Sequence, residues 1–162
     1  MNFRLSSRAI VAIAVVIVVI IGGTYLLLGS ATQVNLKSAP SKFTVSGKTF
    51  EFTYVATNET EWQAGLMNKK VTSNTTMLFV FPNSAVYPFW MYHVNSSLDI
   101  IWLQVTGGEG DVVYLAASVP GCFLPIGCPN YTPTSAANYV IEAQGGFCEL
   151  NGIGLGTQVR FG

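Results

Sequence analysis

One carboxylate inside an apolar run constrains this chain more than any other feature. The segment Phe89–Leu103 reads FWMYHVNSSLDIIWL, and Asp99 lies within its second apolar run. Removing an isolated carboxylate from water is strongly unfavourable, so Asp99 must be paired with a cation, hydrogen-bonded or protonated. The fold around this segment must therefore supply partners for one buried acid.

The charge content excludes one class of partner. Charged residues make up 10% of the 162 residues, and the formal net charge is zero. Ordinary soluble domains carry roughly 25% charged residues. The sequence shows no cluster of Lys and Arg of the kind that binds nucleic acid, so we expect no nucleic-acid partner.

The first thirty residues indicate a membrane segment. Residues 9–28 are almost wholly apolar, and about 20 such residues span the hydrocarbon core of a bilayer as a helix. Arg4 and Arg8 precede the run, and no basic cluster follows it closely. The positive-inside bias therefore predicts that residues 1–8 are cytoplasmic and that the rest of the chain lies outside.

A cleavable signal peptide is the alternative, because Gly29-Ser30-Ala31 forms a small-x-small site. The apolar run is longer than a usual signal-peptide core, which favours an uncleaved signal anchor in the cell membrane, with the lipid bilayer as a partner. Residues 29–41 then form a polar tether, and residues 42–162 form an exported domain. Both interpretations place this domain outside the cytoplasm.

The exported domain has the pattern of a mainly β (α+β) fold. Short runs rich in β-branched and aromatic residues are separated by turn residues such as Gly107-Gly108 and Asn151-Gly152. The expected strands are Thr49–Ala56, Met77–Phe81, Phe89–Tyr92, Leu98–Leu103, Asp111–Ala117, Asn138–Ala143 and Thr157–Phe161. Short connections favour antiparallel pairing, so we expect a compact antiparallel β barrel or sandwich behind one N-terminal transmembrane helix.

One short helix is expected over residues 58–68. Asn58 is a good N-cap, and Glu61 follows three residues later, as in a capping box. Trp62 and Leu66 supply an apolar stripe. Gly65 weakens the pattern, so the helix should be short.

The cysteines and sequons fit an oxidising exterior. Cys122 and Cys128 flank a short loop, and a disulfide between them is the expected state. Cys148 is then left over: it is buried, reshuffles the pairing or joins another chain. Four N-x-S/T sequons predict a glycosylated surface. Their asparagines are Asn58, Asn74, Asn95 and Asn130.

Several motifs, taken in order, resemble the family called domain of unknown function 192. They are Gly65-Leu66-Met67, Met77-Leu78-Phe79-Val80-Phe81, Phe89-Trp90-Met91, Leu98-Asp99-Ile100 and Tyr139-Val140-Ile141-Glu142, followed by a last strand at Gly156–Val159. The resemblance covers about residues 43–161. It implies a small, mostly antiparallel β domain, often exported, with no established activity. This chain differs from the family where Tyr92-His93-Val94 replaces the usual Lys-Asn-Thr, and where Thr157 replaces a common Asp.

Two hypotheses concern the central segment. If its two apolar runs form a hairpin, Asp99 and His93, with Glu142, could form an acid and base group in a cleft edged by Trp90 and Trp102. In the alternative, Asp99 accepts backbone hydrogen bonds from a neighbouring loop, and the aromatic residues pack in the core. The single histidine and the spacing of the acids fit no metal site, and no motif calls for a cofactor.

Two function classes remain open. The first is a binding or interaction module, such as an accessory subunit of a cell-envelope or membrane assembly. The second is an extracytoplasmic enzyme that acts on an envelope substrate through Asp99, His93 and Glu142. The sequence shows no nucleophile elbow and no phosphate-binding loop, which favours the first class.

Overall fold

The computed structural model describes residues 39–124 and 126–162 of the chain. The expected transmembrane segment at residues 9–28 and most of the tether lie outside the described residues. Within the described ranges, no helix is long and apolar enough to span a bilayer.

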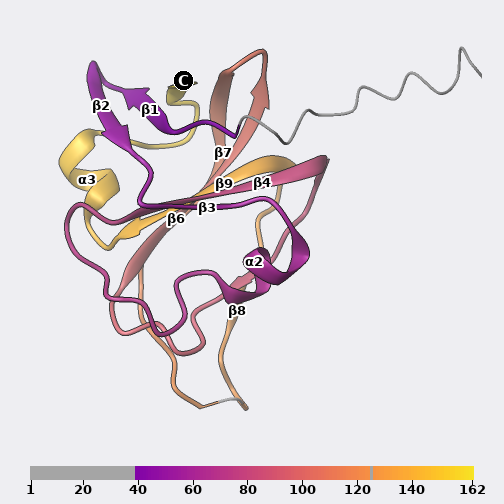
Figure 1. Cartoon of the computed structure of the whole chain (residues 1–162), viewed down its shortest axis with the longest axis vertical. Coiled ribbons are helices and arrows are strands. Elements are labelled where there is room, and N and C mark those ends of the chain that lie inside the picture. Colours follow the sequence, from indigo (N-terminus) through magenta and orange to yellow (C-terminus); the bar gives the residue numbers. More distant parts are fainter. Residues whose placement is uncertain (1–38, 125) are drawn as a thin grey trace, which may run out of the picture. The chain divides into compact units, whose positions relative to one another are not determined.

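The described part of the chain is mainly β, as the sequence predicts, with short helices between strands (Figure 1). Its strands are β1 (Lys42–Val45), β2 (Lys48–Glu51), β3 (Tyr54–Ala56), β4 (Thr76–Ala85), β5 (Phe89–Trp90), β6 (Leu98–Thr106), β7 (Glu109–Val119), β8 (Asn130–Tyr131), β9 (Ala137–Gln144) and β10 (Gln158–Phe161). Its helices are α2 (Glu59–Ala64) and α3 (Phe147–Asn151).

Eight strands form one curled sheet, a half-barrel, in the order β2-β1-β10-β7-β6-β9-β4-β3. Neighbouring strands are antiparallel except β3 and β4, which are parallel. A separate two-stranded sheet pairs β5 with β8. Antiparallel pairing, as expected from the sequence, therefore holds for most of the sheet. The sheet is a half-barrel, where the sequence predicted a barrel or a sandwich.

The two edge strands of the half-barrel are consecutive in the chain. Only Phe52 and Thr53 separate β2 from β3. The Phe52 amide donates to the Ser41 carbonyl at 2.9 Å, and the Thr53 amide donates to the Thr76 carbonyl at 2.9 Å. The single strand predicted over Thr49–Ala56 is therefore wrong, because the chain changes partner at this corner and passes from one sheet edge to the other.

The central strands β4, β6 and β9 are buried on both faces, and each face carries its own hydrophobic cluster. Alternate side chains of a strand point to opposite faces. Residues such as Leu78, Ile101 and Ile141 meet β1, β2, β10 and α3 on one face. Phe79 and Trp102 meet α2 and β5 on the other. Figure 1 shows β1, β2 and α3 on one side of this band of strands and α2 on the other.

The two apolar runs of the central segment do not form the hairpin that was considered from the sequence. The first run forms β5, which pairs with β8, and the second forms β6, which lies between β7 and β9. The intervening chain turns at His93, which has φ 54°. The His93 amide donates to the Cys122 carbonyl at 2.8 Å, so this turn is attached to the disulfide loop.

Helix α2 begins as the sequence predicts and ends earlier. The Asn58 side chain accepts a hydrogen bond from the Glu61 amide at 3.1 Å, and the Glu61 carboxylate accepts one from the Thr57 amide at 2.6 Å. The helix stops at Ala64 because Gly65 has φ 45° and ψ −137°, which leaves the helical region.

Asp99 accepts three backbone hydrogen bonds, as one of the two sequence hypotheses requires. Its side chain is fully buried. Oδ1 accepts from the Ser118 amide at 2.7 Å and from the Gly146 amide at 3.2 Å, and Oδ2 accepts from the Cys148 amide at 2.7 Å. The carboxylate therefore caps the start of α3, whose own N-cap residue, Gly146, has no side chain to do so.

A β-bulge in β7 orients one of these three donors, the Ser118 amide. Leu98 pairs with Val119 and Ile100 pairs with Ala116, so two steps along β6 match three steps along β7. The extra residue lies opposite Asp99, where Ser118 takes φ 51°. A bulge turns the local backbone, and here it directs the Ser118 amide toward the carboxylate.

Cys148 is buried and free, which is one of the three fates considered for it. Burial and the neighbouring Asp99 carboxylate raise the pKa of its thiol. The thiol therefore stays protonated and packs as a small apolar group. Cys122 and Cys128 form the expected disulfide.

We predict that Asp99→Asn destabilises the fold. The amide nitrogen of asparagine would face a backbone N–H where an oxygen now accepts, so one donor is left without a partner. Losing that bond and the charge assistance of the others should lower the free energy of unfolding by about 2–4 kcal/mol. Urea unfolding of the full-length chain, followed by tryptophan fluorescence, measures this change. Asp111→Asn, at an exposed carboxylate on β7, is the matched control, and equal effects of the two substitutions would contradict the prediction.

Candidate functional site

A groove with mostly aromatic walls lies between α2 and the segment that contains β5. Its volume is about 680 Å³. The lining residues are Glu59, Trp62, Gln63, Met67, Phe81, Tyr87, Pro88, Phe89, Trp90 and Tyr92. Binding pockets for small groups typically combine apolar walls with a few polar side chains, and this groove has that composition.

Contacts among the aromatic residues fix the walls of the groove. The rings of Phe81 and Tyr87 stack with centroids 3.7 Å apart, and Trp62 packs against Phe81 at 4.9 Å. The Trp62 indole donates to the Ala56 carbonyl at 3.2 Å, and the Tyr87 hydroxyl donates to the Asn83 carbonyl at 2.9 Å. Because these polar tips are already bonded to backbone, the rings present their apolar surfaces to the groove.

The structure separates the two tryptophans proposed as ligand contacts. Trp90 lines the groove and is 45% exposed. Trp102 is completely buried, its indole donates to the Tyr87 carbonyl at 2.9 Å, and it packs edge-on behind Phe89 at 5.6 Å. Trp90 can therefore touch a ligand, whereas Trp102 supports the groove from behind.

Glu142 lies at a second, small cavity that adjoins the groove. This cavity has a volume of about 20 Å³ and shares Trp62, Gln63, Met67, Phe89 and Trp90 with the groove. Glu142 is 3% exposed, and its Oε2 has no hydrogen-bond partner among the described residues. Burial without a partner disfavours the charged form and raises the pKa of Glu142 to about 8.

Glu142 and Asp99 lie on opposite faces of the sheet. Along the β6–β9 pairing, Glu142 is directly opposite Ile100, and Asp99 is opposite Ala143. Directly opposite residues share a face, and neighbouring residues on a strand do not. The two carboxylates therefore cannot meet at one reaction centre.

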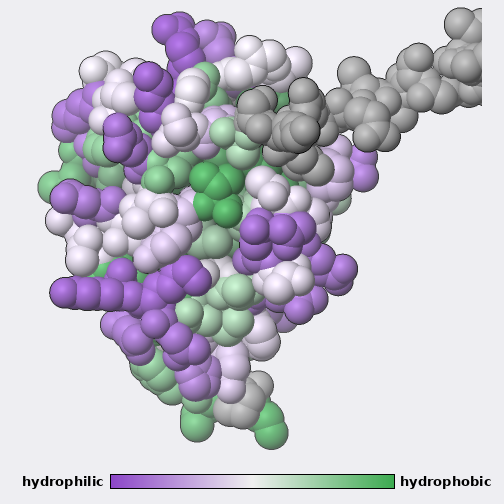
Figure 2. Space-filling view, in the orientation of Figure 1, coloured by the Kyte–Doolittle hydropathy of each residue, from purple (hydrophilic) through white to green (hydrophobic). Residues whose placement is uncertain are grey.

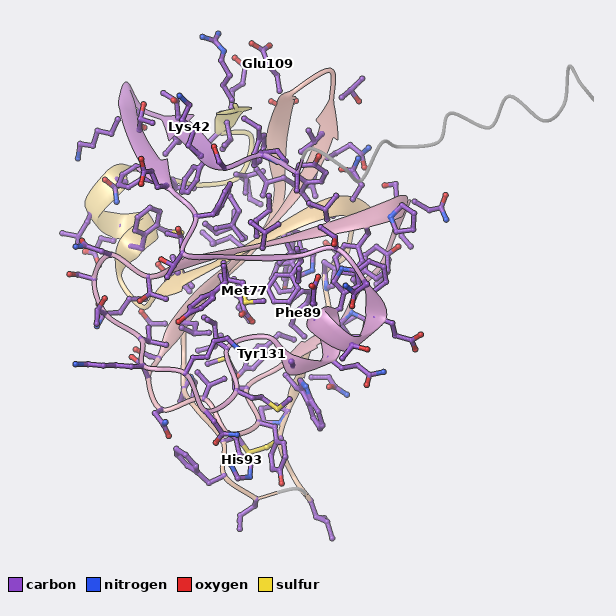
Figure 3. All side chains as sticks on the ribbon, viewed as in Figure 1. Lys42, Met77, Phe89, His93, Glu109 and Tyr131 are labelled. Atoms are coloured by element: carbon purple, nitrogen blue, oxygen red, sulfur yellow. A yellow bond between two sulfur atoms is a disulfide. The ribbon has the colours of Figure 1, made fainter. Side chains whose placement is uncertain are left out.

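His93 is not among the residues that line the groove or the cavity of Glu142. Its ring contacts Tyr92 and Phe123, beside the disulfide loop. In Figure 3, His93 lies toward the lower tip of the domain, whereas Met77, which pairs with Glu142, lies near its middle. The structure thus does not gather the three candidate catalytic residues in one cavity, and of the three Glu142 lines the cavity that adjoins the groove.

The disulfide loop forms an exposed apolar tip. Phe123 is 57% exposed, Leu124 70% and Ile126 89%. Figure 2 shows hydrophobic atoms at this lower end of the domain. The asparagines of all four sequons are exposed, which leaves their glycosylation a prediction. The described residues contain no cluster of His, Cys, Asp and Glu that could hold a metal ion.

Sequence reasoning singled out Trp90 and Glu142 but not the groove that Trp90 lines or the cavity beside it. The missing members are Trp62, Met67 and Tyr87, which come from α2, the loop after it and the loop before β5. An acid within the apolar run of β9 was a usable signal, as it was for Asp99 in β6. Which face it points to depends on strand pairing, which the local pattern does not give.

The comparisons with known proteins agree on the fold. The family model for domain of unknown function 192, described as "Uncharacterized ACR", matches residues 41–161. A protein of unknown function from Novosphingobium aromaticivorans has a TM-score of 0.61 at 23% identity, covering 82% of this chain and 99% of its own. A putative transcription regulator from Sinorhizobium meliloti has a TM-score of 0.60 at 20% identity, covering 76% and 94%. No curated protein matches the chain. At these identities, the two structures show a shared fold and nothing further.

We predict that Glu142 makes stability depend on pH. Its pKa rises from an ordinary 4.5 to about 8 on folding. The contribution of Glu142 to the free energy of unfolding is complete below the pKa that Glu142 has in the unfolded chain. It is lost as the pH rises toward the pKa in the folded chain, because only the unfolded chain then carries the ionised acid. Glu142→Gln removes this loss. The free energy of unfolding of the variant, measured relative to that of the natural chain, should therefore rise by a few kcal/mol between about pH 5 and about pH 8.

Urea unfolding of both proteins at the two pH values measures this difference. Glu149→Gln, at an exposed carboxylate in α3, is the control for removing an acid from the surface. An advantage of Glu142→Gln that is the same at both pH values would show that the Glu142 carboxyl keeps an ordinary pKa.

Proposed function

The chain belongs to the domain of unknown function 192 family, and from this premise we propose that its β domain is a binding module whose groove beside α2 takes a side chain of a partner protein. The observation that carries the proposal is the groove itself. It exposes aromatic surface at a concave site, and aromatic residues in such positions commonly supply most of the energy of a protein contact.

The groove fits a polypeptide side chain better than a glycan. Sugar rings offer many hydroxyl groups, and a site for them needs many free hydrogen-bonding partners. Here the Trp62 and Tyr87 tips are bonded to backbone, which leaves four side chains with hydrogen-bonding groups at the groove, those of Glu59, Gln63, Trp90 and Tyr92. The stem of a long side chain, packed against Trp90, matches this mostly apolar lining.

An enzyme acting through Asp99, His93 and Glu142 is the less favoured function. Both oxygens of Asp99 already accept backbone hydrogen bonds, and His93 lies beside the disulfide loop. General acid and base catalysis needs its groups within hydrogen-bond reach of one reacting centre. The small cavity beside the groove offers one buried acid, Glu142, which suits recognition better than a paired reaction.

The proposal also places the domain outside the cytoplasm, held at the membrane by residues 9–28 as an accessory subunit of a membrane or envelope assembly. The support is the length of the apolar run and the position of Arg4 and Arg8 before it. A tether of a dozen or so residues would keep the groove close to the bilayer.

We predict that the full-length protein stays in the membrane pellet after an alkaline wash, because a spanning helix is retained where a peripheral contact is released. Mild detergent extraction followed by native mass spectrometry should then show an intact N-terminus. A mass that begins near Ala31 would instead establish the cleaved signal peptide. The same spectrum reports the glycans and the disulfide.

We predict that Trp90→Ala releases a partner that co-purifies with the natural protein. Truncating a central aromatic contact costs about 2 kcal/mol or more, which is about a 30-fold loss of affinity. Native mass spectrometry of the extracted complex measures the bound fraction. Leu155→Ala removes a 71% exposed apolar side chain outside the groove and is the matched control. A partner bound equally to both variants, or no partner at all, would contradict the proposal.

A further inference from the structure

We propose that Glu142 binds a primary ammonium group, that of a lysine side chain of the partner protein, which reaches the small cavity through the aromatic groove. The inference rests on the proposed binding function and adds the chemistry of the ligand. Three observations carry it: the size of the cavity, the charge of its surroundings and the unpartnered carboxyl oxygen of Glu142, one of its lining residues.

The size of the cavity selects a small head group. A volume of about 20 Å³ exceeds the 10–15 Å³ or so that one water molecule requires. A primary ammonium is about the size of a water molecule. A guanidinium or a trimethylated ammonium is several times larger and would have to displace the surrounding side chains. The cavity therefore discriminates in favour of lysine over arginine.

The surroundings favour a cation. The linings of the groove and the cavity contain two carboxylates, Glu59 and Glu142, and no Lys, Arg or His. Aromatic faces attract cations, and they also pack well against methylene chains. A lysine stem against Trp62 and Trp90 with its ammonium at Glu142 would use both properties.

A lysine of the protein near this cavity is directed elsewhere. A separate pocket shares Gly65 with the cavity and is lined by residues that include Tyr54, Glu61 and Lys69. The Lys69 ammonium lies over the Tyr54 ring, 5.3 Å from its centroid. Among the described residues, no basic side chain forms an ion pair with Glu142. The carboxyl is therefore free to receive an ammonium from outside.

Binding of an ammonium should release a proton. Because the pKa of free Glu142 is raised to about 8, its carboxyl is mostly protonated at neutral pH. The bound ammonium stabilises the carboxylate, so the acid loses its proton to solvent while the ligand keeps its own. The other titratable groups at the groove are Glu59, Tyr87 and Tyr92, and those of the separate pocket are Tyr54, Glu61 and Lys69.

The test compares two probes on the full-length protein in detergent. Nα-acetyl-lysine N-methylamide carries the ammonium, and Nα-acetyl-norleucine N-methylamide has a stem of similar length without it. Isothermal titration calorimetry should show at least about tenfold tighter binding of the lysine probe at neutral pH. Its affinity should rise about tenfold per pH unit below the pKa of Glu142 and level off above it. Two buffers of different ionisation enthalpy should report the release of about one proton.

Two variants separate the head group from the stem. Glu142→Gln should remove the preference for the lysine probe, its pH dependence and its proton release, while norleucine binding stays the same. Trp90→Ala should weaken both probes alike. Nα-acetyl-arginine N-methylamide should bind no better than the norleucine probe.

The outcomes distinguish this inference from the function on which it rests. Equal binding of the lysine and norleucine probes, both weakened by Trp90→Ala, would overturn the ammonium site and leave the binding module standing. Tight lysine binding that survives in Glu142→Gln would also overturn the ammonium site. Binding of neither probe at millimolar concentration would overturn both.

Discussion

The three backbone hydrogen bonds accepted by Asp99 hold together segments that are far apart in the sequence. One carboxylate on β6 joins the bulge of β7 to the start of α3. Without it, the amides of Ser118, Gly146 and Cys148 would lose this partner, and a one-turn helix would begin without a cap. The face of the sheet that packs against β1, β2 and β10 depends on this arrangement, because Phe147 of α3 is part of that cluster.

The neighbouring strand β9 carries a second buried acid, Glu142, whose situation is the opposite. Asp99 has partners for both oxygens, whereas Glu142 leaves Oε2 without one and has a raised pKa. A well-packed core gains nothing from an unpartnered acid, and a neutral side chain of the same shape would be more stable. The unpartnered acid lies at the cavity beside the groove, on the face of the sheet opposite α3. A ligand bound on that face would compensate for the missing partner, so the acid marks this face as the binding face.

The local pattern of the sequence was sufficient for most of the fold and for part of the site. It predicted strands within β4, β6, β7, β9 and β10, the Asn58 cap and the disulfide, because these depend on neighbours in the chain. It did not predict the corner at Phe52 and Thr53 or the pairing of β5 with β8. A strand buried on both faces reads as a continuous apolar run, so its sequence does not tell which face each residue occupies. For that reason Asp99 and Glu142 could be placed in one site until the register separated them.

The position of Glu142 explains how a modest groove could bind its ligand selectively. Moving a carboxylate from water into a protein interior costs several kcal/mol, and for most ion pairs this cost is incurred when the pair forms. Folding has already removed the Glu142 carboxyl from water, so a bound ammonium displaces a proton from it, and the raised pKa sets the cost of losing that proton. The walls are similarly prepared, since hydrogen bonds from the Trp62 and Tyr87 tips to backbone fix their rings before a ligand arrives. Such preorganisation reduces the cost of binding, and it places the discrimination between an ammonium and an uncharged group at one buried oxygen.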